Sequence, residues 1–245
     1  MIKFFRNIRK SLLSEGKTGK YLKYAVGEII LVVIGILIAL QINNWNEERK
    51  ADLQEKQLLF NLKGEFEDNI KDLDSIALEV DEVIGSLEKL FGKFSPETTN
   101  YSLDSLNIWL SDALESPNWK PSEYLLNNLN NSGGIAELNN PQLKLLLYKW
   151  SRQTKEMQEV QQRTEQTGEE IIAYLKQHGS LRNVDVSDDE FNYTPSTILK
   201  SNAALLSDSW FENHIDDKLY MYVMTRKWLK RARKTLVELI EETKT

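Results

Sequence analysis

Hydrophobic residues form one nearly unbroken run close to the N-terminal end. Residues 25–42 read AVGEIILVVIGILIALQI, and the part from 29 to 40 contains no polar side chain. With its flanks the run reaches about 20 residues, and a helix of that length spans the ~30 Å hydrocarbon core of a bilayer. Tyr24 and Trp45 bracket it, as aromatic residues do at membrane interfaces. The pattern predicts a transmembrane helix over residues 25–45.

Basic residues lie mainly before this run. Residues 1–24 carry seven Lys and Arg against one Glu, so the positive-inside rule places this segment in the cytoplasm and residues 46–245 outside it. The opening sequence, MIKFFRNIRKSLL, sets apolar residues on one face with basic flanks. That pattern predicts an amphipathic helix on an anionic leaflet. No small-x-small cleavage site follows the run, which favours an uncleaved anchor over a signal peptide.

Small residues and one carboxylate occur inside the predicted span. Gly35 and Ala39 form a small-xxx-small pair, and Gly27 continues the same face. The stripe predicts close packing against another helix, although Gly and Ala are common in membrane helices generally. Glu28 is a functional candidate, as a proton relay or as a contact to a basic partner. The alternative is that Glu28, one turn from Lys23, reaches the cytoplasmic headgroups or pairs with a lysine.

Beyond the span, apolar residues recur with a helical period. No proline interrupts residues 43–95, so the membrane helix is expected to continue until Ser95-Pro96. A narrow seam is typical of a two-stranded coiled coil, whereas a wider stripe favours packing among several helices. Here Ile76, Val83 and Leu90 widen the stripe. Its two main positions hold Leu59, Phe66, Leu73, Val80, Leu87 and Phe94, and Ile70, Ala77, Ile84 and Phe91.

The rest of the chain predicts further helices and no strand. Asn140-Pro141 combines a capping residue with proline at the first helical position, and a long helix should run from there to about residue 177. A last long helix is expected over 214–242. Shorter helices are predicted over 101–114, 122–131 and 195–207. The predicted fold is all-α, an antiparallel bundle of three long helices and several short ones.

Composition restricts the chemistry that the domain can perform. Cysteine is absent and only His178 and His214 are present, which removes thiol chemistry, most zinc sites and most histidine bases. Residues 43–245 carry 24 Lys and Arg against 35 Asp and Glu, an acidic balance that argues against nucleic acid as a partner. No phosphate-binding loop, nucleophile elbow or zinc-protease motif occurs. We therefore expect no enzymatic activity and no cofactor.

Two acidic or histidine-containing groups are candidate metal sites. The loop from Asp185 to Glu190 offers oxygen ligands for calcium but lacks the EF-hand spacing, so a solvated loop is expected. His178 and His214 flank the segment 179–213 and could both approach Asp216 or Asp217 to bind a metal, but nothing in the sequence fixes their separation. Five tryptophans are expected to be core or interface residues rather than a ligand cage: Trp109, Trp119, Trp150, Trp210 and Trp228.

A basic cluster places six cations in nine residues of the last helix: Arg226, Lys227, Lys230, Arg231, Arg233 and Lys234. Such a cluster can bind lipid headgroups, an acidic partner or an anionic ligand. The favoured alternative is internal pairing. If the last helix runs antiparallel to the first, the cluster should meet four acids there: Glu65, Glu67, Asp68 and Asp72.

The N-terminal region resembles a known family. The run over 24–47, YAVGEIILVVIGILIALQINNWNE, the preceding MIKFFRNIRKSLLSEGK, and NSGGI at 131–135 ahead of LKLL at 143–146 are similar to an uncharacterised family of single-pass proteins from Bacteroidota-type bacteria. The resemblance implies an inner-membrane location, a helical periplasmic domain and no catalytic residues to transfer. The expected function is a non-enzymatic scaffold, adaptor or accessory subunit that contacts membrane lipid and a protein partner or further copies of itself. The alternative is a ligand-sensing bundle that signals through its membrane helix to a separate partner.

Overall fold

A computed structural model describes residues 18–96, 102–188 and 190–244. Within these ranges the chain is helical and contains no strand, which confirms the predicted all-α class. Most of the basic segment predicted over 1–24, residues 1–17, lies outside the described residues. The chain divides into two compact units, residues 1–58 and 59–245. The elements are α2 (Thr18–Phe91), α3 (Leu103–Leu114), α4 (Tyr124–Ser132), α5 (Gly134–Glu137), α6 (Pro141–His178), α7 (Leu181–Asp185), the 3-10 helix η1 (Ala203–Ser207) and α8 (Ser209–Glu242).

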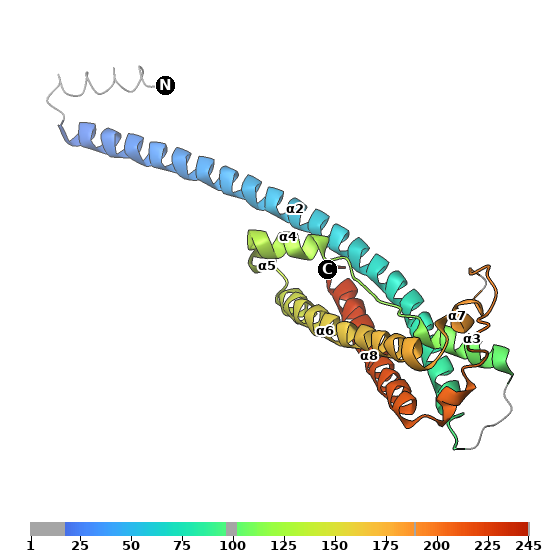
Figure 1. Cartoon of the computed structure of the whole chain (residues 1–245). Coiled ribbons are helices and arrows are strands. Elements are labelled where there is room, and N and C mark those ends of the chain that lie inside the picture. The colour runs from blue at the N-terminus through green and yellow to red at the C-terminus, as the bar shows by residue number, and fades with distance from the viewer. Residues whose placement is uncertain (1–17, 97–101, 189, 245) are drawn as a thin grey trace. The chain divides into compact units, whose positions relative to one another are not determined.

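The first unit contains the beginning of α2 (Figure 1). This helix includes the whole predicted span and is long and apolar enough there to cross a membrane. Side chains around the entire circumference of residues 29–40 are exposed. An apolar helix with no buried side is stable in lipid or against other helices, because the backbone polar groups are satisfied within the helix.

In the second unit α2 buries one position of the predicted heptad stripe from Phe66 to Leu87 and the other only in part. Phe66, Leu73, Val80 and Leu87 are each at most 1% exposed. Val83 and Leu90 are buried as well, as are residues on other helices that face them, so the stripe is wide. This agrees with the prediction of packing among several helices rather than a narrow two-stranded seam.

The end of α2 differs from the prediction. The helix stops at Phe91, before Ser95-Pro96, and Gly92 follows with its N–H bonded to the Glu88 carbonyl at 3.0 Å. Glycine destabilises a helix interior, so this end needs no proline. Phe91, the last residue of the helix, is 41% exposed. Phe94 lies beyond the helix end and packs on Phe211, with ring centroids 6.0 Å apart.

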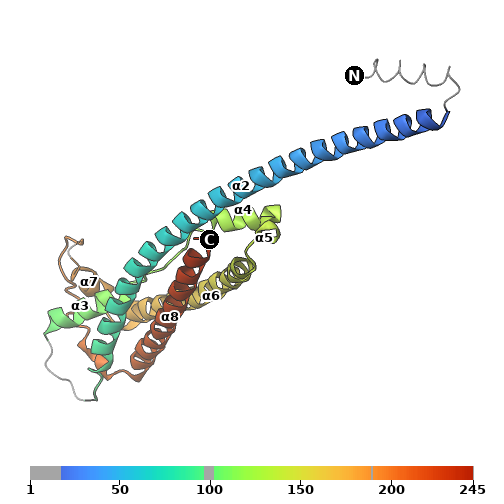
Figure 2. The same ribbon diagram turned by 180° about the vertical axis from the view of Figure 1, so that it is seen from behind.

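The helices α6 and α8 lie side by side in opposite directions (Figures 1 and 2). The Asn140 side chain accepts hydrogen bonds from the N–H groups of Gln142 and Leu143, which confirms the predicted start of α6. Lys149 pairs with Glu238 at 3.0 Å, and Thr164 bonds to Thr225 at 3.0 Å, so rising numbers in α6 meet falling numbers in α8. This antiparallel pair carries much of the core.

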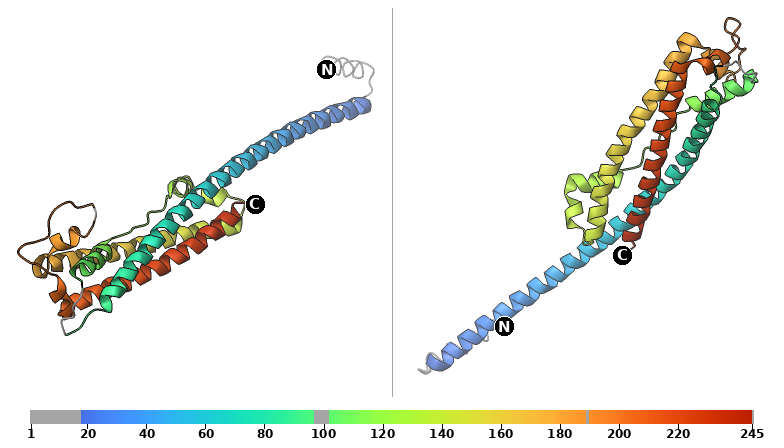
Figure 3. Two further views of the ribbon diagram at one scale, coloured as in Figure 1. Left: turned by 90° about the vertical axis from the view of Figure 1, so that its right-hand side faces the viewer. Right: turned by 90° about the horizontal axis from the view of Figure 1, so that it is seen from below.

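The connection between α6 and α8 does not match the prediction. Thr194-Pro195 opens no helix, and only the short η1 forms before α8. Polar side chains hold the chain here instead: Arg182 Nε donates to the Thr194 carbonyl at 2.6 Å, and Asn183 Oδ1 accepts from the Ser196 N–H at 2.7 Å. Both residues lie on α7, the short helix that follows α6 (Figure 3).

Candidate functional site

A groove of about 510 Å³ lies between α2 and α3 in the second unit. Its volume falls within the range of small-molecule sites in proteins. Four carboxylates and one lysine give it a negative character. The residues that line it are Glu79, Glu82, Val83, Gly85, Ser86, Lys89, Asp112, Glu115 and Pro117.

The helical period of α2 explains one wall of the groove. Glu79, Glu82 and Ser86 are spaced by three and four residues, so they share one face of the helix. Ser86 Oγ donates to Asp112 Oδ2 at 3.1 Å and so ties this wall to α3. At Gly85 an added Cβ would meet nothing within 4 Å, which leaves the middle of the groove open.

The chemistry of the groove favours an organic cation or a basic side chain. Carboxylates accept hydrogen bonds from ammonium and guanidinium groups, and these charge-assisted bonds are strong. Across the described residues, no group of three or more His, Asp or Glu side chains is arranged to hold a metal ion. The carboxylates of the groove can accept hydrogen bonds from an amine.

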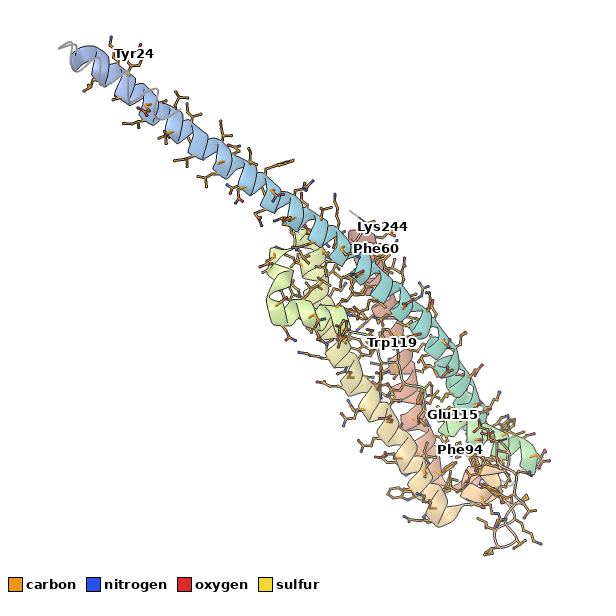
Figure 4. The ribbon with its side chains drawn as sticks, turned by 90° about the horizontal axis from the view of Figure 1, so that it is seen from above. Tyr24, Phe60, Phe94, Glu115, Trp119 and Lys244 are labelled. Carbon is orange, nitrogen blue, oxygen red and sulfur yellow. The ribbon has the colours of Figure 1, made fainter. Side chains whose placement is uncertain are left out.

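A buried lysine holds the segment that borders the groove. Lys218 of α8 has no exposed surface, and its Nζ donates to the Glu115 carbonyl at 3.2 Å. The Tyr222 hydroxyl donates to the same carbonyl at 2.9 Å. Figure 4 labels Glu115 and Trp119, which bound this segment. Two donors one helical turn apart thus fix the chain where it leaves α3.

Burial changes the acidity of both donors. It lowers the pKa of the Lys218 ammonium to about 8, because the charged form is poorly solvated in the core. It raises the pKa of the Tyr222 phenol to about 12 for the same reason. Gly168 of α6 makes room for the lysine, since a Cβ there would lie 3.2 Å from Lys218 Nζ.

Lys218 was not predicted from the sequence, although the sequence contains a signal for it. Phe211, Ile215, Tyr222 and Leu229 follow one apolar face of α8, and all are buried. Lys218 stands at the expected spacing on that same face. A charged residue in a core position of a helix indicates a specific buried partner.

The basic cluster divides into two groups. Arg233 makes two bonds to the Asp74 carboxylate, at 2.7 and 3.0 Å, and Arg226 bonds to Asp81 at 3.2 Å. Two residues of the cluster therefore pair with acids of α2, as predicted, although not with the acids that were predicted. The other four cations lie on the outer side of α8: Lys227, Lys230, Arg231 and Lys234. Arg231 lies over the Trp228 ring at 5.1 Å.

The predicted partners of the cluster were wrong. Glu65 accepts from Ser122 Oγ at 2.6 Å and from the Leu125 N–H at 3.0 Å. Asp68 pairs with Lys71 in its own helix at 2.7 Å, and Glu67 with Lys63 at 3.6 Å. The antiparallel register brings the cluster to acids farther along α2. The prediction failed because the sequence indicates the relative direction of the two helices but not their offset along the axis.

The candidate residues of the span all lie on α2. Added Cβ atoms at Gly27 and Gly35 would meet nothing within 4 Å, and Ala39 is exposed. Glu28 is partly exposed. Packing of this stripe against another helix therefore stays a prediction.

The two histidines come together on one aromatic ring. The Tyr174 ring centroid lies 4.3 Å from that of His178 and 5.3 Å from that of His214. Tyr174 donates its hydroxyl to Asp208 Oδ2 at 2.6 Å, and this bond lowers the pKa of the Asp208 carboxyl. His214 Nδ1 also lies 3.9 Å from Glu170 Oε2, and His178 is exposed, so these contacts form a partly exposed aromatic and polar cluster.

The remaining candidates have structural contacts. In the acidic loop, the Tyr193 hydroxyl donates to Asp185 at 3.2 Å, and Asp188 accepts from the Glu190 N–H at 3.0 Å. Trp119 and Trp150 pack against each other in the core, with ring centroids 6.1 Å apart. Trp210 is 71% exposed and so is not a core residue.

Residues 28–101 match the model of a family of unknown function (DUF6090). No curated protein and no solved structure matches the chain. The match begins at Glu28 and covers the larger part of α2. It supports the resemblance to an uncharacterised family and assigns no activity to any residue.

Proposed function

We propose that this chain is a non-enzymatic adaptor or accessory subunit anchored in the inner membrane. The observation that carries the proposal is the exposure of apolar side chains on every face of α2 over residues 29–40. Leu31 and Leu37, for example, are 64% and 57% exposed, although they lie on different faces. Side chains of this kind are stable in lipid or against another membrane helix.

The proposed orientation places residues 1–24 in the cytoplasm and residues 46–245 in the periplasm. Seven basic residues precede the span within short reach, and basic residues near a membrane helix are retained on the cytoplasmic side. The acidic balance of residues 43–245 agrees with this assignment.

The proposed contact surface for a partner is the acidic groove. Its four carboxylates and its volume suit a protein segment that presents lysine or arginine side chains. Such a contact explains how a domain without a catalytic constellation among its described residues can act through binding.

Crosslinking in the native cells tests this proposal. A photo-crosslinking amino acid at Gly85 places the probe in the open part of the groove. The matched control carries the same probe at Leu78, which is 68% exposed on α2 but does not line the groove. After extraction in mild detergent, a second protein joined to the Gly85 variant and not to the Leu78 variant is expected. A native mass of the chain alone, without crosslinked product at either position, would contradict the adaptor function.

A second candidate function, ligand sensing, is favoured by the same groove. Its volume of about 510 Å³ also accommodates a small organic cation. A ligand that binds only the folded state stabilises it by RT ln(1 + [L]/Kd), so the thermal midpoint rises with the logarithm of ligand concentration above Kd. A screen of diamines and other cationic metabolites on the full chain should then show stabilisation that is lost in Glu79→Gln/Glu82→Gln. The adaptor function predicts no such stabilisation.

A further inference from the structure

A second, much smaller cavity lies on the inner side of the segment that follows α3. It is bordered by Asn118 of that segment, by Gln161 and Thr164 of α6, and by Thr225 of α8. Its volume of about 10 Å³ is close to the minimum that one water molecule requires. Any larger guest is excluded by size.

Two amide atoms at this cavity have no hydrogen-bond partner among the described protein atoms. Gln161 is 6% exposed, and its Nε2 donor is unpaired. The buried Asn118 Oδ1 acceptor is unpaired as well. The orientation of the Asn118 amide is fixed by its Nδ2, which faces Glu165 Oε1 at 3.5 Å, because the reversed amide would set an oxygen against the carboxylate. An unpaired buried donor or acceptor destabilises the folded state.

The two threonines supply a third unfilled position. Thr164 Oγ1 donates its proton to the Val160 carbonyl at 2.9 Å. Since a hydroxyl has one proton, Thr225 must be the donor in the 3.0 Å bond between the two threonines. Thr225 Oγ1 therefore retains lone pairs that can accept a hydrogen bond.

We propose that one ordered water molecule occupies this cavity as a permanent part of the fold. The water accepts from Gln161 Nε2 and donates to Asn118 Oδ1 and Thr225 Oγ1. Three hydrogen bonds are typical of buried waters. A metal ion or an ammonium ion does not fit, because neither can accept the proton of the Gln161 amide.

The water joins three segments that are distant in sequence: α6, α8 and the segment that follows α3. The same chain segment borders the acidic groove on its other side through Pro117. This hydrated contact is independent of the proposed function, because it depends only on atoms inside the second unit.

Replacing the amide donor tests the proposal through stability. Gln161→Met in the full chain is expected to lower the thermal midpoint by about 3–6 °C, since Asn118 and Thr225 lose the water that satisfies them. A dry cavity predicts the opposite sign, because methionine would remove an unpaired donor. A midpoint equal to or above that of the wild type would overturn the proposal.

The matched control is Gln153→Met on the same helix. Gln153 also has an unpaired buried atom, its Oε1, but the adjoining cavity has no room for a water molecule. Its replacement by methionine is expected to leave the midpoint unchanged or to raise it. An equal loss in both variants would attribute the effect to amide removal alone and would also overturn the proposal.

Direct observation decides the point if Gln161→Met fails to fold. A crystal structure of the wild-type full chain, at a resolution that shows ordered solvent, should place a water within hydrogen-bond distance of Gln161 Nε2, Asn118 Oδ1 and Thr225 Oγ1. A direct bond between the two amides with no water between them would refute the assignment.

Discussion

At the scale of single residues, Lys218 is the buried charged side chain of the described core. An ammonium group in a helical bundle is unfavourable unless it is paired, and here it receives one backbone carbonyl and a contact to the Tyr222 ring at 5.4 Å. The Lys218 hydrogen bond fixes the segment after α3, but burial of the charged ammonium lowers the free energy of unfolding. Removing the charge should therefore stabilise the domain.

The pH dependence of stability follows from the pKa of Lys218. It is about 8 in the folded state and 10.5 in the unfolded state, so between these values the unfolded chain binds more protons and stability increases with pH. The gain from this group is at most about 3 kcal/mol. Above pH 10 the raised pKa of Tyr222 acts in the opposite direction, because the unfolded phenol ionises first. Denaturant unfolding of the full chain from pH 7 to 10 should show the rise.

The variant that isolates this effect is Lys218→Met. It is expected to be more stable than the wild type at pH 7 and to lose the increase between pH 8 and 10. If wild type and variant respond to pH in parallel, the lysine is not the titrating group.

Two glycines of the bundle should respond to alanine in opposite ways. At Gly168 a Cβ would lie 3.2 Å from Lys218 Nζ and 3.5 Å from Ser116 Oγ, so the lysine must move and the bundle should be destabilised. At Gly64 nothing lies within 4 Å, and alanine should stabilise the helix by about 0.5–1 kcal/mol. Thermal midpoints of the two variants test this, and a gain at both positions would show that Lys218 moves without cost.

At the scale of elements, the sequence predicted features that depend only on neighbouring residues. The Asn140 cap and one heptad position of α2, from Phe66 to Leu87, were confirmed because capping and burial periodicity depend on neighbouring residues. The helix predicted to begin at Thr194-Pro195 was wrong because the same residue pair also begins a turn. Side chains of α7 hydrogen-bond to the loop that forms there instead. The offset between α2 and α8 was missed because it is set by core packing along the whole contact.

The register of α2 and α8 gives a testable pair. Arg233→Glu and Asp74→Arg should each destabilise the domain slightly, and the double variant should recover about 0.5 kcal/mol, a small value because both side chains are about half exposed. The recovery should shrink at high salt. A cycle with Arg231 and Glu67, the pair expected from sequence, should show no coupling. The reverse result would require a different register.

At the scale of the whole molecule, the predicted class and the span were accessible from composition and periodicity. The groove was not, because Glu79 and Asp112 belong to different helices and meet only after α3 packs on α2. The inner cavity was hidden for the same reason. The sequence indicates which face of a helix carries a carboxylate. The distance between the faces of two helices depends on the loops that connect them and on the core between them.

The two compact units predict separable effects of mutations. Gly35→Leu in the first unit should reduce crosslinking to a partner helix in the membrane, because a bulky side chain prevents close approach. Val33→Leu, two residues away on the opposite face, is the matched control. Neither variant should alter unfolding of the second unit. Equal crosslinking in both variants would remove the small-residue stripe as a contact surface.

The burial of Lys218 also provides a chemical reporter. Amine-acylating reagents modify lysines only where the amine reaches solvent, so Lys218 should react only when α8 transiently separates from Glu115. The exposed Lys227 in the same helix serves as an internal standard within one peptide map. The ratio of the two labelling rates would measure opening of the bundle beside the groove in native membranes, without any engineered probe.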